Sequence, residues 1–274
     1  MSYGWPVKPF ARQHPVRGFF NDPRIDGASH AFHFGIDISA PDGTEVFSVA
    51  PGTVFIEDRG HAVAVKSGAR VFAYWHVKPA VAHHQQVGLH QLLGRIEPGW
   101  AHVHFAESVN RRYLDPLRNG AIEPFVDVGH PTVSQIVLRH GAAEVKGEPI
   151  RGLIDICCTA FDTTPIAVPA PWSHMPVAPA LVRFRIVRDG RALVGWRSGV
   201  DLRRFRTVDA FHLIYAPETR QNHPGKPGTY RYWLARDLDT RRLGNGACRI
   251  DVEAQDAHGN RARASRTVTV ANPG

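Results

Sequence analysis

Short apolar runs separated by turn residues dominate the first 125 residues. Examples are EVFSV at 45–49, HAVAVKSG at 61–68 and RVFAYWHV at 70–77. Their alternation of apolar and polar positions, and their β-branched and aromatic side chains, are typical of β-strands. No useful length of this region shows the 3.6-residue period of an amphipathic helix. The pattern therefore predicts a first unit built from β-strands.

A second series of strand-like runs follows a segment at 114–131 that holds three prolines and two glycines. Such a segment is typical of a domain exit, and we place the boundary at residue 130. The later runs are SQIVLRHG (134–141), PIRGLIDICCTAFD (149–162), ALVRFRIVRDGRALVGW (180–196) and ACRIDVEAQDAHGNRARASRTVTVAN (247–272). Six or more short strands, one pair joined by an Asp-Gly turn, predict an immunoglobulin-like β-sandwich over 131–274.

Two stretches of the second unit do not fit strands. The proline-rich stretch 165–179 and the stretch 216–230 are predicted to be long loops.

Charge and histidine are divided unevenly between the two units of this 274-residue chain. Residues 1–130 carry 12 Lys/Arg and 12 Asp/Glu, whereas residues 131–274 carry 21 and 13, so the net charge of +8 lies in the second unit. Eleven of the 16 histidines lie in the first unit. This division indicates that the two units have different functions.

The three cysteines and the N-terminal segment give information about the cellular compartment. Cys157, Cys158 and Cys248 are interpreted as reduced strand residues, the alternative being a disulfide from Cys248 to one of the adjacent pair. No apolar stretch approaches the roughly 18–20 residues of a membrane span, and the N-terminus lacks the apolar region of a secretory signal. We expect a protein that stays inside the cell or one whose leader is missing from this sequence.

Two pairs of residues have spacings that suit a metal. In HAFHFGIDIS, His33 and Asp37 share a face of an extended segment, and a bend near Gly35 brings them towards one ion. In AHVHF, His102 and His104 project from the same side of a strand. Each pair alone is compatible with buried, hydrogen-bonded histidines and a solvated aspartate.

A fifth residue, His76, lies in VFAYWHVKP on a strand that is otherwise apolar and aromatic. Two histidines and one carboxylate leave the fourth position of tetrahedral zinc open, which is the arrangement of a hydrolytic site. Two further histidines beside that position could transfer protons and stabilise a developing oxyanion. The combination therefore predicts a hydrolytic metal centre more strongly than any of its parts.

From Trp5 to Leu117 the sequence also resembles the lysostaphin/LytM-type zinc endopeptidases, which cleave stem or cross-link peptides of bacterial peptidoglycan. The resemblance rests on WPV, FFNDPR, HFGIDISAPDGTEVFSVAPGTV, YWHV, GLHQLLGRI, HVHF and DPL in this order. It implies one Zn²⁺ per chain, held by His33, Asp37 and His104. It implies His102 as general base and His76 as the oxyanion-stabilising residue, on an antiparallel β-sheet groove that carries a duplicated hybrid motif.

Three positions depart from the family pattern without touching the metal or catalytic residues. Ala101 stands where a small residue or proline is usual, Glu107 lies one place later than the usual acidic residue, and His90-Gln91 replaces a Gly-Gln turn. Six further histidines of this unit are interpreted as surface or structural residues. They are His14, His30, His61, His83, His84 and His90.

The leading functional hypothesis is a zinc endopeptidase of the bacterial cell wall, expected at the envelope or outside the cell. One alternative is a catalytically silent LytM-like regulator or binding protein of wall hydrolases, although all five site residues are retained. Another is the same chemistry on a peptide from a different source. The basic unit, residues 131–274, either carries solvated arginines or binds anionic wall polymer. Nucleic-acid binding is not supported, because no recognition helix or aromatic RNA-binding motif accompanies the charge.

Overall fold

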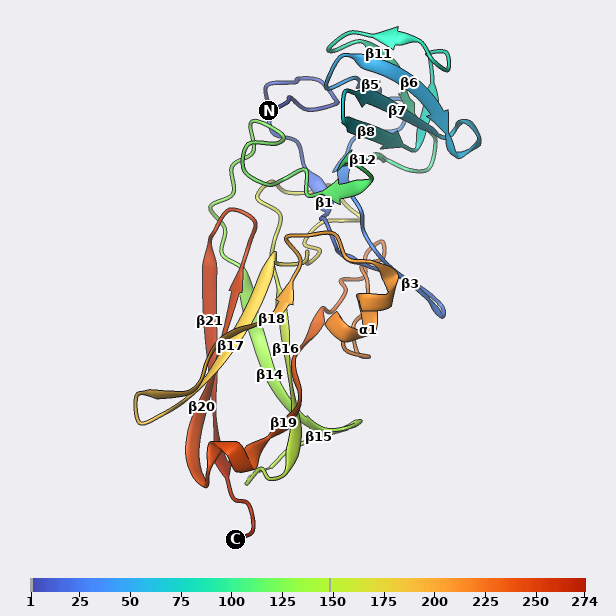
Figure 1. Cartoon of the computed structure of the whole chain (residues 1–274). Helices are drawn as coiled ribbons and strands as arrows, with labels where there is room; N and C mark the ends of the chain where they lie inside the picture. Colours follow the sequence, from blue (N-terminus) through green and yellow to red (C-terminus); the bar gives the residue numbers. More distant parts are fainter. Residues whose placement is uncertain (1, 148) are drawn as a thin grey trace.

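The chain folds into two β-domains. The computed structural model describes residues 2–147 and 149–274 (Figure 1). Within these residues the α-helix is limited to α1 (Phe211–Ile214), and no helix has the length and apolar character of a membrane span. The prediction of an all-β chain, with antiparallel sheets followed by a β-sandwich, is confirmed.

The first domain is built on an eight-stranded antiparallel sheet in the order β1-β4-β12-β8-β7-β6-β10, with β13 paired to β12. Its strands are β1 (Val16–Gly18), β4 (Ile36–Ser39), β6 (Gly52–Glu57), β7 (Ala62–Ser67), β8 (Arg70–Trp75), β10 (Gln86–Val87), β12 (His102–Val109) and β13 (Arg112–Leu114). A three-stranded sheet joins β5 (Glu45–Phe47), β11 (Leu92–Ile96) and β9 (Val77–Pro79).

Side chains along β12 point alternately into the core of the first domain and towards the opposite face, which carries the candidate site. Val103 and Phe105 are fully buried in the apolar core, whereas His102 and His104 project from the other side of the strand. This is the arrangement expected from the period of two in a strand. The predicted common orientation of the two histidines is confirmed.

The second domain is a sandwich of two four-stranded sheets, β15-β14-β16-β19 and β18-β17-β20-β21. Its strands are β14 (Thr132–His140), β15 (Ala143–Glu144), β16 (Leu153–Phe161), β17 (Leu181–Arg188), β18 (Arg191–Asp201), β19 (Arg231–Asp239), β20 (Gly246–Gln255) and β21 (Arg261–Val270). The predicted turn at Asp189-Gly190 joins β17 to β18, and both residues have positive φ angles as such a tight turn requires. Strand β19 and helix α1 were not predicted.

A short hairpin from the first domain packs into the core of the second. The hairpin consists of β2 (Pro23–Asp26) and β3 (Ser29–Phe32), and it lies beside α1 (Figure 1). Phe32 is buried among apolar side chains of the sandwich, with its ring centroid 5.4 Å from that of Phe211 and 5.7 Å from that of Tyr215. The core of the second domain thus includes a residue of the first.

Two fully buried polar residues, Asn21 and Asp22, fix this junction. The Asn21 side-chain amide donates to the carbonyl of Leu202 at 2.8 Å, and the Tyr215 hydroxyl donates to the Asn21 carbonyl at 2.8 Å. The Asp22 carboxylate accepts from the backbone N–H of Ala178 at 2.7 Å. Buried polar groups that are satisfied across an interface give it a single geometry, because any displacement leaves them unpaired.

Candidate metal centre and its cleft

The metal-binding residues predicted from the sequence come together on one face of the sheet, at β4 and β12. These strands pair so that Asp37 lies opposite His104. His33 follows the end of β3, and a bend at Gly35 leads into β4. The predicted bend is therefore present. A Cβ at Gly35 would collide with the carbonyl oxygen of Phe105, so only glycine allows the two segments to approach this closely.

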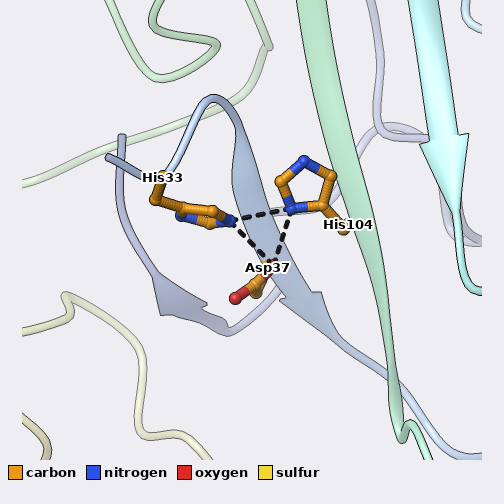
Figure 2. Close-up of side chains that lie close together, drawn as sticks. All are labelled: His33, Asp37 and His104. Atoms are coloured by element: carbon orange, nitrogen blue, oxygen red, sulfur yellow. Dashed lines mark hydrogen bonds and ion pairs between the residues drawn. The ribbon is translucent and has the colours of Figure 1, made fainter. Parts of the chain in front are cut away.

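Three donor atoms converge beside β4 and β12 (Figure 2). His33 Nε2 lies 3.1 Å from Asp37 Oδ1 and 2.8 Å from His104 Nδ1. His104 Nδ1 lies 3.0 Å from Asp37 Oδ1. His33 and His104 are buried and the Asp37 side chain is 13% exposed, so water competes little for their lone pairs.

The protonation states of these groups suit a cation. His33 Nδ1 lies 2.8 Å from the carbonyl oxygen of Phe19, which only accepts, so the ring proton sits on Nδ1 and the lone pair of Nε2 faces Asp37. Burial, reinforced by Arg24, lowers the pKa of His33 to about 3. Burial alone raises the pKa of Asp37, but nearby positive charge, above all that of Arg24, more than offsets it and holds that pKa well below its usual range. At neutral pH the centre offers neutral imidazole and ionised carboxylate.

The donor set fits zinc. Two imidazole nitrogens and one carboxylate oxygen are a common set for catalytic zinc, with bonds of about 2.0–2.2 Å, so that ligand atoms on one tetrahedral ion lie roughly 3.3–3.6 Å apart. The observed separations of 2.8–3.1 Å need only a small expansion. Lone pairs facing one another this closely repel unless a proton or a cation lies between them.

His102 lies next to this centre. Its Nδ1 lies 2.7 Å from the carbonyl oxygen of Trp100, an acceptor, and 2.6 Å from Arg17 Nη2, a donor, so the two contacts call for opposite protonation of Nδ1. In the tautomer with the proton on Nδ1, Nε2 carries a lone pair and lies 3.4 Å from Asp37 Oδ1. That tautomer presents a basic nitrogen beside the three donors.

His76 faces His102 from the other side, with ring centroids 4.7 Å apart. Our expectation that His76 lies within a strand is wrong in detail, because it occupies the break between β8 and β9 with a φ of 65°. Its ring stacks on that of Trp100 at 3.5 Å, which holds it in place. Burial and the neighbouring His102 lower the pKa of His76 to about 3, so the imidazole is neutral at neutral pH.

Sequence reasoning missed two arginines that touch these residues. Arg24 donates to Asp37 Oδ2 at 2.8 Å and leaves Oδ1 to face the histidines. Arg17 Nη2 lies 2.6 Å from His102 Nδ1 and donates to the Trp100 carbonyl at 3.1 Å. Arg24 belongs to the FFNDPR motif, but nothing in the sequence showed that either guanidinium would reach the centre.

The departure at Glu107 has a structural explanation. Its fully buried carboxylate lies on the side of β12 away from the donors and accepts from Tyr3 and Arg118 at 2.8 and 2.7 Å. Arg70 completes this group. Ala106 takes the neighbouring position on the donor side, and His104 Nε2 is buried there without a hydrogen-bond partner in the described chain.

A cleft with a volume of about 450 Å³ opens over the five site residues. Its size falls within the range of about 300–1,000 Å³ that is usual for ligand sites. The six histidines interpreted as surface or structural residues do not line it. His30 instead packs against His212 at the domain junction, and His61 pairs with Glu97 at 2.8 Å.

The model of peptidase family M23 matches residues 31–116, a range that contains all five site residues. The first domain of this chain is similar to peptidase family M23, and we call it the M23 domain below. The predicted resemblance to lysostaphin/LytM-type peptidases is thereby confirmed. No curated protein sequence matches the chain.

Three solved structures similar to this chain each cover less than half of it. The SpoIIQ–SpoIIIAH pore-forming complex is 18% identical over 45% of this chain and 92% of that chain, with a TM-score of 0.38. A zinc-containing peptidase from Vibrio cholerae is 22% identical over 42% and 39%, with a TM-score of 0.36. The catalytic domain of lysostaphin from Staphylococcus simulans is 23% identical over 36% and 86%, with a TM-score of 0.31.

Proposed function

We propose that this protein is a zinc metalloendopeptidase that hydrolyses peptide bonds in the stem or cross-link peptides of bacterial peptidoglycan. The observation that carries the proposal is the convergence of His33, Asp37 and His104 beside two further histidines in one cleft. The match of residues 31–116 to the model of peptidase family M23 supports the choice of a peptide substrate.

His33, Asp37 and His104 would hold one Zn²⁺, which supplies Lewis-acid polarisation and lowers the pKa of water. The chain's own contribution is to set the protonation of these groups. The Phe19 carbonyl keeps the His33 proton on Nδ1, and Arg24 keeps Asp37 ionised. Partners of this kind orient ligands and raise metal affinity, commonly by 10–100-fold.

His102 and His76 take the two proton-handling roles in this proposal. His102 accepts a proton at Nε2 from the attacking water, and the resulting imidazolium remains bonded to the Trp100 carbonyl through Nδ1. His76, neutral and fixed against Trp100, donates an N–H to the oxyanion that develops on the peptide carbonyl. Stacking on the indole limits the reorganisation of His76 during the reaction.

The two sets of residues predict separable mutant behaviour. His33→Ala and Asp37→Ala should lose zinc, because two remaining ligands bind weakly. His102→Ala and His76→Ala should keep about one zinc per chain but lose roughly 10²-fold or more in activity. Metal analysis of each purified variant, with digestion of peptidoglycan preparations and masses of the released peptides, measures both properties.

Each assignment has an outcome that contradicts it. Full zinc occupancy in Asp37→Ala would remove Asp37 from the ligand set. Loss of zinc in His102→Ala, together with retention in His104→Ala, would reverse the assignment of that pair. A wild-type protein that binds zinc but releases no peptide from any preparation would be a silent relative rather than an enzyme.

A further inference from the structure

The second domain forms part of the cleft wall. Trp172, Gln221 and Asn222 line the cleft together with the site residues of the M23 domain. Trp172 lies in the loop between β16 and β17, and the other two lie in the loop between α1 and β19. These are the two stretches that the sequence predicted to be long loops.

Hydrogen bonds hold the two loops to each other. The Asn222 side-chain amide donates to the Pro176 carbonyl at 2.7 Å, and its oxygen accepts from the N–H of Gly228 at 2.8 Å. The backbone N–H of Gly225 donates to the Pro171 carbonyl at 2.8 Å. Asn222 therefore has a structural role, and the wall is held in one position.

The side-chain amide of Gln221 has a hydrogen-bonded oxygen and a nitrogen that is available to a bound molecule. Its Oε1 accepts from the backbone N–H of Ile25 in β2 at 2.5 Å, which fixes the orientation of the amide. Its Nε2 has no hydrogen-bond partner among the residues that the structure describes, although the side chain is half-buried in the cleft wall. An amide held in this way offers two N–H donors to a bound molecule.

Trp172 supplies an aromatic surface beside the proposed base. The guanidinium of Arg17 lies over its indole at 4.4 Å, and the same guanidinium contacts His102. The indole of Trp100 lines the cleft beside His76. An apolar wall with a few placed donors is typical of a site that binds a molecule in one orientation.

We propose that Gln221 and Trp172 bind the substrate of the M23 cleft, so that the second domain is part of the specificity site. Gln221 donates from Nε2 to a backbone carbonyl of an extended peptide, and Trp172 packs against an apolar side chain of the same peptide. This inference rests on the proposed function, because it concerns the peptide that the site residues would cleave.

The primary test is Gln221→Glu in the full-length, zinc-loaded protein. Glutamate keeps an oxygen for the Ile25 N–H but removes both donors and places a negative charge towards the carbonyl. We expect KM for a soluble cross-linked muropeptide to rise about tenfold, because the loss of one hydrogen bond weakens binding by about that factor. We expect kcat to change less than about threefold. Zinc content should equal that of the wild type.

Trp172 is tested with a conservative and a disruptive change. Trp172→Ala should raise KM about 5–30-fold, and Trp172→Phe should recover most of the loss because an aromatic face remains. Two variants in the second domain serve as matched controls, Trp196→Ala and Gln135→Glu. Both lie outside the cleft lining and should leave KM unchanged.

Binding measured without turnover separates this inference from the proposed activity. The same substitutions are placed in the His102→Ala protein, and its affinity for the muropeptide is measured by calorimetry. Weaker binding in both variants supports the inference even if the wild type cleaves nothing. Unchanged KM and unchanged affinity in both variants would overturn it while the peptidase activity stands. If the His102→Ala protein binds no muropeptide and the wild type cleaves none, both are wrong.

Discussion

At the scale of single residues, the junction of the two domains buries three carboxylates side by side. One oxygen from each of Asp127, Asp162 and Asp256 lies within 4.8 Å of the others. No ion pair to any of the three is present within the described residues. Burial, with Asp127 and Asp256 as minor contributors, raises the pKa of Asp162 to about 7. The folded protein therefore holds a proton there that the unfolded chain releases near pH 4.

This proton makes stability depend on pH in a defined direction. Because the pKa of Asp162 is raised in the folded state, its contribution is present below about pH 4 and is lost as the pH rises to about 7. Asp162→Asn removes this dependence while keeping an acceptor for the Thr163 N–H. We expect the free energy of unfolding of the variant, relative to the wild type, to increase by about 1–4 kcal/mol between pH 4 and pH 8.

Urea denaturation at several pH values measures this difference. EDTA in every sample keeps divalent ions away from the carboxylates in both proteins. A difference in stability that stays constant from pH 4 to pH 8 would show that Asp162 ionises normally in the folded state.

The residues of the proposed centre could be predicted because each carries a local signal. The spacing of His33 and Asp37 shows that they share a face of an extended segment, and the alternation of His102 and His104 shows the same for a strand. Such a face is determined by residues that are close together in the sequence. Gln221 and Trp172 carry no such signal. They reach the cleft because two loops of the sandwich fold back against the M23 domain, and this depends on contacts between residues more than 100 positions apart.

At the scale of elements, the β2–β3 hairpin connects the sandwich to the metal centre. Phe32 is the last residue of β3 and is buried in the second core, and His33 follows it directly. The two-residue turn at Gly27-Ala28 could have been predicted as a hairpin from its sequence, because glycine in the first position is a hairpin signal. Its packing partner could not, because alternation indicates which face of a strand is buried and not which domain covers it.

Removing the Phe32 ring should therefore affect both stability and metal binding. Phe32→Ala is expected to cost about 3–5 kcal/mol of stability through the cavity it leaves. It should also weaken zinc binding, because the chain that positions His33 loses its anchor. Titration with a zinc chelator and urea denaturation measure the two effects.

Phe184 provides the matched control. It is buried in the same core but lies in β17, away from the ligands. Phe184→Ala should lower stability by a similar amount and leave zinc affinity unchanged. Equal zinc affinity in the Phe32 and Phe184 variants would show that the hairpin does not position His33.

At the scale of the whole molecule, ion pairs determine where the positive charge of the basic second domain is concentrated. Arg183 and Arg263 pair with Glu253 at 2.7 and 2.6 Å, and Arg185 pairs with Asp251 at 2.8 Å. The net charge of +8 already counts the carboxylates of these pairs, so the pairs determine where the excess positive charge lies and not its size. Exposed arginines outside these pairs, such as Arg197 and Arg242, contribute most of this excess.

We propose that these exposed arginines attract anionic wall polymer. Binding to purified cell walls should fall several-fold between 50 and 200 mM salt, because surface charges are screened within about a Debye length. The double variant with Arg197→Gln and Arg242→Gln should bind more weakly at low salt, whereas Arg95→Gln in the M23 domain serves as the control. Sedimentation with walls measures binding, and a result independent of salt and of both arginines would contradict the electrostatic role.

The packing of Phe32 into the sandwich also affects the order of folding. The hairpin precedes most of the M23 domain in the chain, but its partners Phe211 and Tyr215 are synthesised some 180 residues later. Contacts between residues this far apart in the sequence form late, because closing a long loop costs conformational entropy before the contact can stabilise the chain.

We expect the loop carrying His33 to stay mobile until the C-terminal domain has formed. In pulse-labelled refolding, the amide of His33, which bonds to the Asp22 carbonyl, should gain protection no earlier than those of β17. Earlier protection would refute this order. On this order the proposed metal centre assembles only after the strands of the sandwich that enclose Phe32 have been synthesised.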